Sequence, residues 1–265
     1  MLCLSSVLLG TVVPAAINIR LEGEFPDFNH FYLEQLAELA RIAGVDWNMN
    51  VGLSKGIRYA RDWQLDHCTT KYLWTGDDDV IFDSLCLSNF SAYTALLEAE
   101  HLGPKGERFY PAFLQGSKAD VNNRRGYPDH SKVVSEQGAN VPYHSFFAQS
   151  CSSDDDQLKR QVMLDPGNAL LSVGYFRGHT LRFTQFDDGF NAAGEDALMA
   201  LHIHAEGSCG LRVPSARAFH LEKPAGSRFG ETAARAEAVL RSAQLKGYDA
   251  SVLGKDFVAY EKKTS

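Results

Sequence analysis

The first third of the chain alternates between short apolar runs and helical patterns, and this alternation limits the folds open to it. Strands are expected at residues 16–19, 45–50 and 71–75, with a helix in each interval. Strands that alternate with helices form mostly parallel sheets joined by right-handed crossovers. Such sheets bind ligands just beyond the carboxyl ends of their strands. The third strand runs directly into Asp77-Asp78-Asp79, so the sequence predicts a Rossmann-like α/β fold with a ligand site at this aspartate run.

Two helices are expected between these strands. Apolar residues at helical spacing mark the buried side of the first helix: Leu33, Leu36, Ala37 and Ala40. Asp27 or Asn29 is the expected cap at its start, and Gly44 is the expected stop. The second helix is expected at residues 54–64, with a second set of residues on its buried side: Ile57, Ala60 and Trp63.

Composition excludes several classes of protein. The 265 residues are 45% hydrophobic and 22% charged, which is typical of a globular domain. The formal charge of −7 supplies no general positive field for phosphate backbones, so no nucleic-acid partner is expected. Five cysteines without a CxxC pair fit neither a disulfide framework nor a zinc site. We therefore expect a cytoplasmic protein, with peripheral membrane association left open.

The apolar start of the chain has two interpretations. Residues 1–16 end in Val13-Pro14-Ala15-Ala16 and resemble the hydrophobic region of a signal peptide, but they lack a basic segment before it. The alternative is one or two buried strands of a covered sheet, which the pattern favours. No run reaches the roughly 18 apolar residues that a bilayer span needs, so no transmembrane segment is expected.

Regular patterns are weaker in the middle of the chain. Residues 103–160 carry Gly, Pro, Asn and charged residues with little periodicity. This range is interpreted either as a functional loop or lid, or as an element that the pattern does not reveal. After it, a strand is expected at residues 168–173, helices at 195–204 and 231–246, and a strand at 213–221.

The aspartate run is chemically costly without a cation. Adjacent carboxylates repel each other and raise one another's pKa, and a hard divalent ion relieves this repulsion. In an extended chain Asp77 and Asp79 point to the same side, so this D-x-D spacing offers two carboxylates to one metal. The later run Asp154-Asp155-Asp156 follows Ser152-Ser153 and is interpreted as an ordinary helix start.

Three motifs follow in the second half of the chain: Gly167-Asn168-Ala169-Leu170, Phe186-Asp187-Asp188-Gly189-Phe190 and Gly194-Glu195-Asp196. Together with the aspartate run, their order resembles the nucleotide-sugar glycosyltransferases of the GT-A fold, particularly the inverting family 2 group. The resemblance covers about residues 16–222. It implies one GT-A domain over residues 1–265, with a nucleotide-binding half (1–102), an irregular loop or lid (103–160), an acceptor-side half (161–230) and a C-terminal helix and tail (231–265).

The resemblance also implies the donor site. Asp77 and Asp78 would bind the nucleotide-sugar, and Asp79, with Asp77 and His220, would hold Mn²⁺ or Mg²⁺. For His220 a purely structural role is equally open. Three more residues are implied to contact the nucleotide-sugar: Arg61, Asp46 and Asn168. Asp46 or Asn48 stands where the family has a base-reading aspartate, and Arg61-Asp62 stands where it has an Arg-Asn pair.

Asp196 is implied to be the general base, and Glu195 would orient the acceptor beside it. A carboxylate within about 3 Å of an acceptor hydroxyl can take its proton during attack. The expected function is therefore metal-dependent, inverting transfer of one sugar from a nucleoside-diphosphate-sugar, with UDP-sugar as the expected donor, to a glycan or glycoconjugate hydroxyl. A retaining transferase, a sugar nucleotidyltransferase and a non-catalytic carbohydrate-binding relative are the alternatives.

Overall fold

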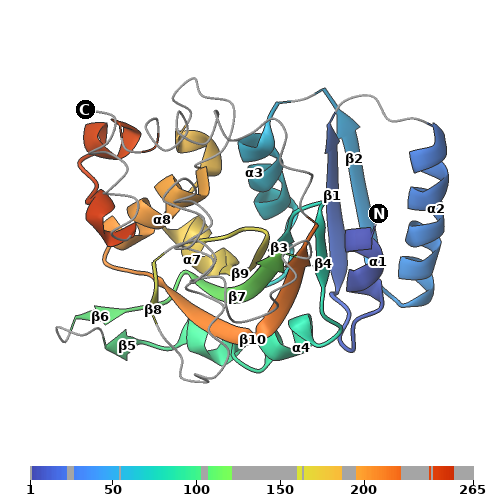
Figure 1. The fold of residues 1–265 in the computed structure, drawn as a ribbon, viewed down its shortest axis with the longest axis horizontal. Coiled ribbons are helices and arrows are strands. Elements are labelled where there is room, and N and C mark those ends of the chain that lie inside the picture. The colour runs from blue at the N-terminus through green and yellow to red at the C-terminus, as the bar shows by residue number, and fades with distance from the viewer. Residues whose placement is uncertain are drawn as a thin grey trace.

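The computed structural model describes residues 2–22, 27–53, 55–102, 107–120, 160–162, 164–186, 195–221, 239 and 241–253. Its first part forms a small unit of two parallel strands and two helices (Figure 1). The elements are α1 (Leu2–Leu8), β1 (Ala16–Glu22), α2 (Asp27–Ile42) and β2 (Asp46–Gly52). Helix α2 ends at Ile42, just before the predicted stop at Gly44, whose φ of +72° favours glycine. The expected caps Asp27 and Asn29 have side chains outside the described residues.

The central sheet has the order β3-β9-β7-β10-β4, with β8 paired to β10. Its strands are β3 (Tyr72–Gly76), β4 (Val80–Phe82), β7 (Phe113–Asp120), β8 (Arg160–Gln161), β9 (Asn168–Ser172) and β10 (Gly210–His220). A separate pair, β5 (His101–Leu102) and β6 (Arg108–Phe109), lies at the far end of the molecule (Figure 1).

The α/β class agrees with the prediction, but the expected mostly parallel pairing does not hold among the described strands. Only β1–β2 and β7–β10 are parallel, whereas β9 runs antiparallel to both β3 and β7, and β4 and β8 run antiparallel to β10. Central strands covered on both faces are apolar whichever way they run, so their composition does not encode direction.

Helices cover both faces of the central sheet. Helices α3 (Ile57–His67), α7 (Val173–Gly178) and α8 (Glu195–Ala205) lie on one side, and α4 (Cys86–Ser91) lies on the other (Figure 1). Neighbouring residues of one strand enter opposite cores: Phe113 packs with α7 and α8, and Leu114 packs with α4. Short 3-10 helices complete the described elements: η1 (Thr94–Glu98), η3 (Phe183–Phe186) and η4 (Ala250–Leu253).

Strand β7 lies inside the range with little periodicity, so for residues 113–120 the second interpretation holds, that of an element which the pattern does not reveal. The strand is central and buried, with Gln115 only 2% exposed and Ser117 only 1% exposed. Gln115 Nε2 donates to Asn168 O at 2.9 Å, and Ser117 Oγ donates to Pro214 O at 2.7 Å. These polar side chains are tolerated because their partners come from β9 and β10, which are distant in sequence. Residues 121–159, including Asp154-Asp155-Asp156, lie outside the described residues.

The apolar N-terminal segment forms helix α1 rather than the expected buried strands. Cys3 and Val7 pack against β4 and α4, while Leu4, Val7 and Leu8 pack against β1 and α2. Short apolar runs fit a strand or a helix equally well, and here tertiary packing decides. None of the helices in the described ranges has the length and hydrophobicity that a bilayer crossing requires.

Helix α3 buries a polar face, which contradicts the expected inner side of Ile57, Ala60 and Trp63. The buried residues are Arg58, Arg61, Asp62 and Leu65. Arg58 Nη1 donates to Phe186 O at 2.6 Å, and Asp62 Oδ1 accepts from the backbone N–H of Phe183 at 2.7 Å. The helix is therefore fixed to η3 by hydrogen bonds, which the spacing of its apolar residues cannot indicate.

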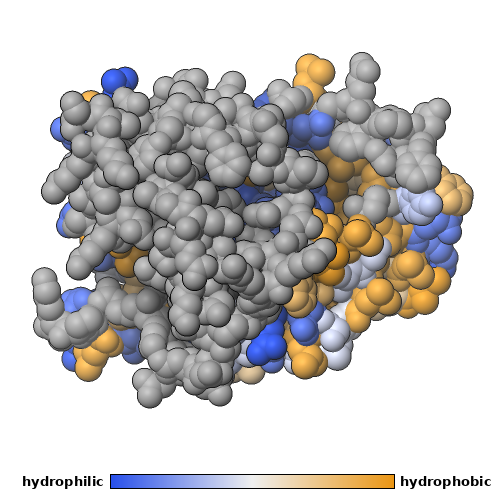
Figure 2. Space-filling model, viewed as in Figure 1, coloured by the Kyte–Doolittle hydropathy of each residue, from blue (hydrophilic) through white to orange (hydrophobic). Residues whose placement is uncertain are grey.

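The outer surface of the β1–β2 unit is apolar in places. Figure 2 shows hydrophobic residues gathered over this part of the molecule. The large hydrophobic side chains exposed on α2 and around β2 include Leu39, Ile42, Met49, Val51 and Leu53.

Replacing Asp62 by alanine is expected to lower the free energy of unfolding by about 1–3 kcal/mol. The carboxylate also accepts from Thr184 N at 3.0 Å and Thr184 Oγ1 at 2.6 Å, so its loss leaves donors at the start of η3 without their partner. Urea denaturation measures the change. Asp66→Ala on the same helix is the control, because Asp66 is half exposed and forms a surface ion pair with Arg182. Equal stability of the two variants would contradict the prediction.

Candidate active site

The three aspartates form the turn between β3 and β4. The backbone N–H of Val80 donates to the backbone oxygen of Asp77 at 3.4 Å, and this hydrogen bond closes the turn. Asp78 is exposed, whereas the side chains of Asp77 and Asp79 are 29% and 27% exposed and face partners in the protein. Asp77 directly follows the last residue of β3, as predicted, and the three aspartates form a turn rather than a continuation of the strand.

Arg61 joins the aspartate turn to the start of α8. Its Nη2 lies 2.7 Å from Asp77 Oδ1, and its Nε lies 3.6 Å from Glu195 Oε1. The arginine side chain is 6% exposed and Glu195 is 4% exposed, so the pair that they form is shielded from water. Burial lowers the pKa of Arg61, but the charges of Asp77 and Glu195 raise it by more. One buried cation therefore brings together two motifs that are far apart in sequence.

Asp79 lies against His220 at the end of β10. His220 Nε2 is 3.4 Å from Asp79 Oδ2, and Leu221 N donates to Asp79 O at 2.7 Å. The contact with His220 lowers the pKa of Asp79 below its usual value, although burial opposes the shift. The side chain of His220 is 20% exposed, so the pair lies at an accessible edge of the site.

The donor atoms of Asp79 and His220 suit a divalent ion such as Mn²⁺. A carboxylate oxygen from the β3–β4 turn and an imidazole nitrogen from β10 lie 3.4 Å apart, and one cation could bind both. Asp77 fits less well as a third ligand because its Oδ1 is taken by Arg61. Over the described ranges, no three His, Cys, Asp or Glu side chains gather in metal-binding positions. Two protein ligands with substrate oxygens are still a common arrangement for such ions.

Glu195 and Asp196 open helix α8 as the sequence predicts. Asp196 is 6% exposed, and its Oδ1 accepts from Ala197 N at 2.8 Å. Glu195 Oε2 is buried and accepts no hydrogen bond from the described residues. The preceding motif residues 187–194, with Asp187 and Gly194, lie outside the described part.

A cavity of about 800 Å³ separates β1 from β3 and reaches the aspartate turn. Arg61, Asp77 and Asp78 line it, together with Arg20 and Glu22 at the carboxyl end of β1. Apolar side chains also line it, among them Val7, Ile17, Leu33 and Leu73. A cavity of this size that combines apolar walls with a few polar groups is typical of a small-molecule site.

Comparison with known proteins is informative at the level of structure only. No protein-family model and no curated protein sequence matches the chain. The structure of GalNAc-T7 with UDP, GalNAc and Mn²⁺ is similar at a TM-score of 0.55 and 13% identity, over 91% of this chain and 44% of that one. The chain has the GT-A fold.

Structures of S. aureus TarS 1–349 support the same assignment. With UDP-GlcNAc the TM-score is 0.54 at 11% identity, and with UDP it is 0.54 at 12% identity. Each comparison covers 91% of this chain and 61% or 60% of TarS 1–349. The GT-A chain thus spans less than two thirds of the length of these similar structures.

Asn168 of this GT-A fold occupies a position that does not suit its expected contact with a nucleotide-sugar. It is 0% exposed, and its Nδ2 donates to Ser117 O at 3.0 Å and Ala216 O at 2.9 Å. Its Oδ1 lies 3.4 Å from both Trp74 Nε1 and Cys86 Sγ. The residue ties β3, β7, β9 and β10 together behind the aspartate turn, which is a structural role.

Asp46 is also poorly placed for the expected base contact. It is exposed at the amino-terminal start of β2, pairs with Ala16 and is not among the residues that line the cavity. The other candidate, Asn48, donates through Nδ2 to Asn18 Oδ1 at 3.0 Å and does not line the cavity either.

Two charged residues of the site were missed by the sequence argument. Lys118 on β7 and Asp165 before β9 form an ion pair, with Nζ 2.8 Å from Oδ2. Lys118 stands in the range taken as irregular, so nothing marked it as buried. Asp165-Pro166-Gly167 directly precedes the Gly-Asn motif, and this turn sequence at the end of a loop is the signal that could have found Asp165.

Proposed function

We propose that the protein is a metal-dependent, inverting glycosyltransferase that moves one sugar from a nucleoside-diphosphate-sugar to a hydroxyl acceptor. The observation that carries this proposal is the position of Arg61 between Asp77 and Glu195. It supports a single site in which the aspartate turn and the Glu195-Asp196 pair act together. The similar structures contain UDP or UDP-GlcNAc, and this supports a UDP-sugar as the donor.

Some residues of the chain would bind the donor, and others would act on the acceptor. Arg61 and Asp77 would orient the nucleotide beside the cavity, and exposed Asp78 would assist there. Asp196 would accept the proton of the acceptor hydroxyl as it attacks. Glu195 Oε2, which has no hydrogen-bond partner among the described residues, would accept a second acceptor hydroxyl and so orient it. Attack on the sugar face opposite the diphosphate gives inversion.

Asp79 and His220 would hold a divalent ion. A bound Mn²⁺ or Mg²⁺ would neutralise negative charge on the departing diphosphate. Their 3.4 Å approach supports this assignment, and the presence of Mn²⁺ in the GalNAc-T7 structure agrees with it. The acceptor would be a glycan or glycoconjugate, and a cytoplasmic location fits this chemistry.

Donor binding is expected to raise the melting temperature. A ligand at a hundred times its dissociation constant stabilises a protein by about 2.7 kcal/mol, which corresponds to a shift on the order of 5–10 °C for a domain of this size. The screen uses UDP-, GDP-, dTDP- and CDP-sugars, each with and without Mn²⁺. No shift with any of them would contradict the proposed donor class.

The reaction product distinguishes the remaining alternatives. The transferred sugar is expected to have the anomeric configuration opposite to that in the donor, which NMR of the product measures. Retention of configuration would indicate a retaining transferase, and release of pyrophosphate from a nucleoside triphosphate would indicate a sugar nucleotidyltransferase. Donor binding without hydrolysis or transfer across an acceptor panel would indicate a non-catalytic carbohydrate-binding protein.

A further inference from the structure

Lys118 places a fixed positive charge beside the aspartate turn. It lies near the end of β7, with its side chain 13% exposed. Its Nζ is 2.8 Å from Asp165 Oδ2 and 3.1 Å from Asp165 Oδ1, so both carboxylate oxygens hold the ammonium group. The ammonium group is therefore held more firmly than that of a lysine on an open surface.

Asp165 is itself held by the backbone and by a buried amide. Its Oδ1 accepts from Gly167 N at 2.9 Å, and its own N–H donates to Gln115 Oε1 at 2.7 Å. Gln115 and Lys118 belong to the same strand, β7. The ammonium position is therefore fixed by two neighbouring strands rather than by the lysine side chain alone.

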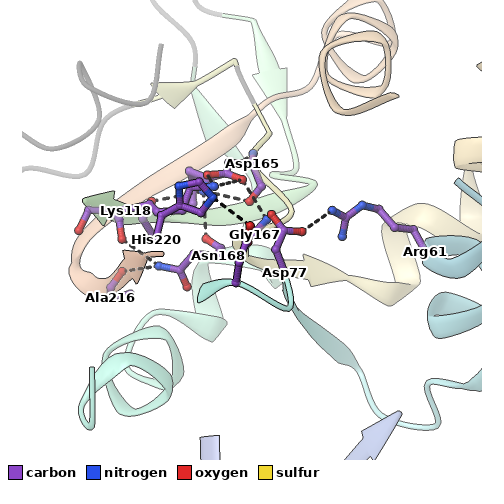
Figure 3. A network of polar contacts seen from close by, with 12 residues as sticks. Arg61, Asp77, Lys118, Asp165, Gly167, Asn168, Ala216 and His220 are labelled. Carbon is purple, nitrogen blue, oxygen red and sulfur yellow. Dashed lines mark hydrogen bonds and ion pairs between the residues drawn. The ribbon is translucent and has the colours of Figure 1, made fainter. Parts of the chain in front are cut away.

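Lys118 and Asp77 meet at Gly167, which has no side chain. A Cβ on Gly167 would lie 2.6 Å from Asp77 Oδ2, 2.9 Å from Lys118 Nζ and 2.9 Å from Asp165 Oδ1. The three charged groups thus surround the same face of this glycine. Figure 3 shows Asp77 between Arg61 on one side and the group of Lys118, Asp165 and His220 on the other.

The carboxylates around Lys118 favour its protonated form. Burial lowers the pKa of the Lys118 ammonium, but the carboxylates of Asp165 and Asp77 raise it by more. A diphosphate entering beside Asp77 and Asp79 brings more negative charge, so nearby fixed cations would be its natural ligands.

We propose that Lys118 is a donor-binding residue that contacts the diphosphate beside Asp77 and Asp79, and that it gives the protein affinity for a nucleoside diphosphate even without a divalent ion. This inference rests on the proposed function. It assigns a second cationic ligand to the donor, on the side of Asp77 opposite Arg61. Lysine is a frequent phosphate ligand because its compact ammonium group acts as a point charge.

The test is calorimetric titration of the wild type and of Lys118→Met with UDP and with uridine, each in EDTA and in Mn²⁺. We expect measurable UDP binding in EDTA, and binding about tenfold weaker or more in Lys118→Met. Uridine affinity should be the same in both proteins, since uridine lacks the phosphates. Lys71→Met is the matched control, because Lys71 is exposed and pairs with exposed Glu98.

Lys118→Met leaves the buried Asp165 carboxylate without its ammonium partner, which could prevent folding. The double variant Lys118→Met/Asp165→Asn removes both charges, so the inference can still be tested if the single variant does not fold. It should show the same loss of UDP affinity, with unchanged uridine affinity. Lys118→Arg should recover part of the UDP affinity. A purely structural role would change UDP and uridine binding together.

Two results would overturn the inference while leaving the proposed function in place. One is UDP binding that requires Mn²⁺, and the other is UDP binding in EDTA that is equally tight in the wild type and the double variant. If UDP, GDP, dTDP and CDP all fail to bind with or without Mn²⁺, the proposed function fails and the inference fails with it.

Discussion

The Asp196→Asn protein is expected to fold normally, to bind the donor as the wild type does, and to transfer sugar about 10²–10⁴-fold more slowly. An amide has the shape of a carboxylate but cannot take the proton of an acceptor hydroxyl. Its oxygen can still accept the hydrogen bond from Ala197 N, now 2.8 Å from Asp196 Oδ1, so the start of α8 should be preserved. Single-turnover transfer at saturating Mn²⁺ measures the rate, and calorimetry measures donor affinity.

Asp66→Asn is the matched control for this experiment. Asp66 lies on α3, is half exposed and pairs with Arg182 away from the aspartate turn, so transfer by this variant should equal that of the wild type. A wild-type rate in Asp196→Asn would refute the base assignment. A rate loss accompanied by an equal loss of donor affinity would instead place Asp196 in donor binding.

The second large effect is expected for Arg61→Met, which should lower the free energy of unfolding by about 3–5 kcal/mol and also abolish transfer. The substitution leaves Asp77 and Glu195 close together without the cation that now lies 2.7 Å and 3.6 Å from them. The corresponding fall in melting temperature is on the order of 10 °C. Arg41→Met is the control, because Arg41 is an exposed arginine paired with Glu38 on α2.

Removing the charges that face Arg61 tests whether the loss comes from the ion pairs. The triple variant Arg61→Met/Asp77→Asn/Glu195→Gln has no uncompensated carboxylate at these positions, so it should be more stable than Arg61→Met. It should remain inactive, since donor and acceptor residues are both altered. A triple variant less stable than Arg61→Met would show that Arg61 stabilises the fold through packing rather than charge.

Much of the fold could be predicted where local pattern and tertiary packing agree. Helix α2 has an apolar stripe and a glycine stop, and helix α8 opens on Glu195-Asp196; both were found close to their observed bounds. Strand β7 could not be predicted because Gln115, Gly116, Ser117 and Lys118 break any apolar pattern. Gln115 and Ser117 can be buried because their side chains donate hydrogen bonds to Asn168 in β9 and Pro214 in β10, and such partners are invisible in a local window.

The candidate site, too, could be predicted from the sequence only in part. Asp77, Asp79, Glu195 and His220 could be named from motifs, and the structure brings them to one region through Arg61 and the β4–β10 pairing. Asn168 was misjudged because a motif shows that a residue type recurs, but not whether its side chain faces a ligand or the core. Both ends of its amide are bound by the protein.

The irregularity in β10 determines where the strand delivers its last side chains. Val213 is opposite Gly116 and Arg217 is opposite Ser117, so three residues of β10 are additional to the ladder. Their carbonyls are held by side chains from other elements: Ser117, Asn89 and Asn168. Because side chains alternate along a strand, an odd insertion reverses the face on which the following residues emerge. The residues after the irregularity, up to His220, therefore emerge on the face opposite to that of an unbroken strand, and on this face His220 meets Asp79.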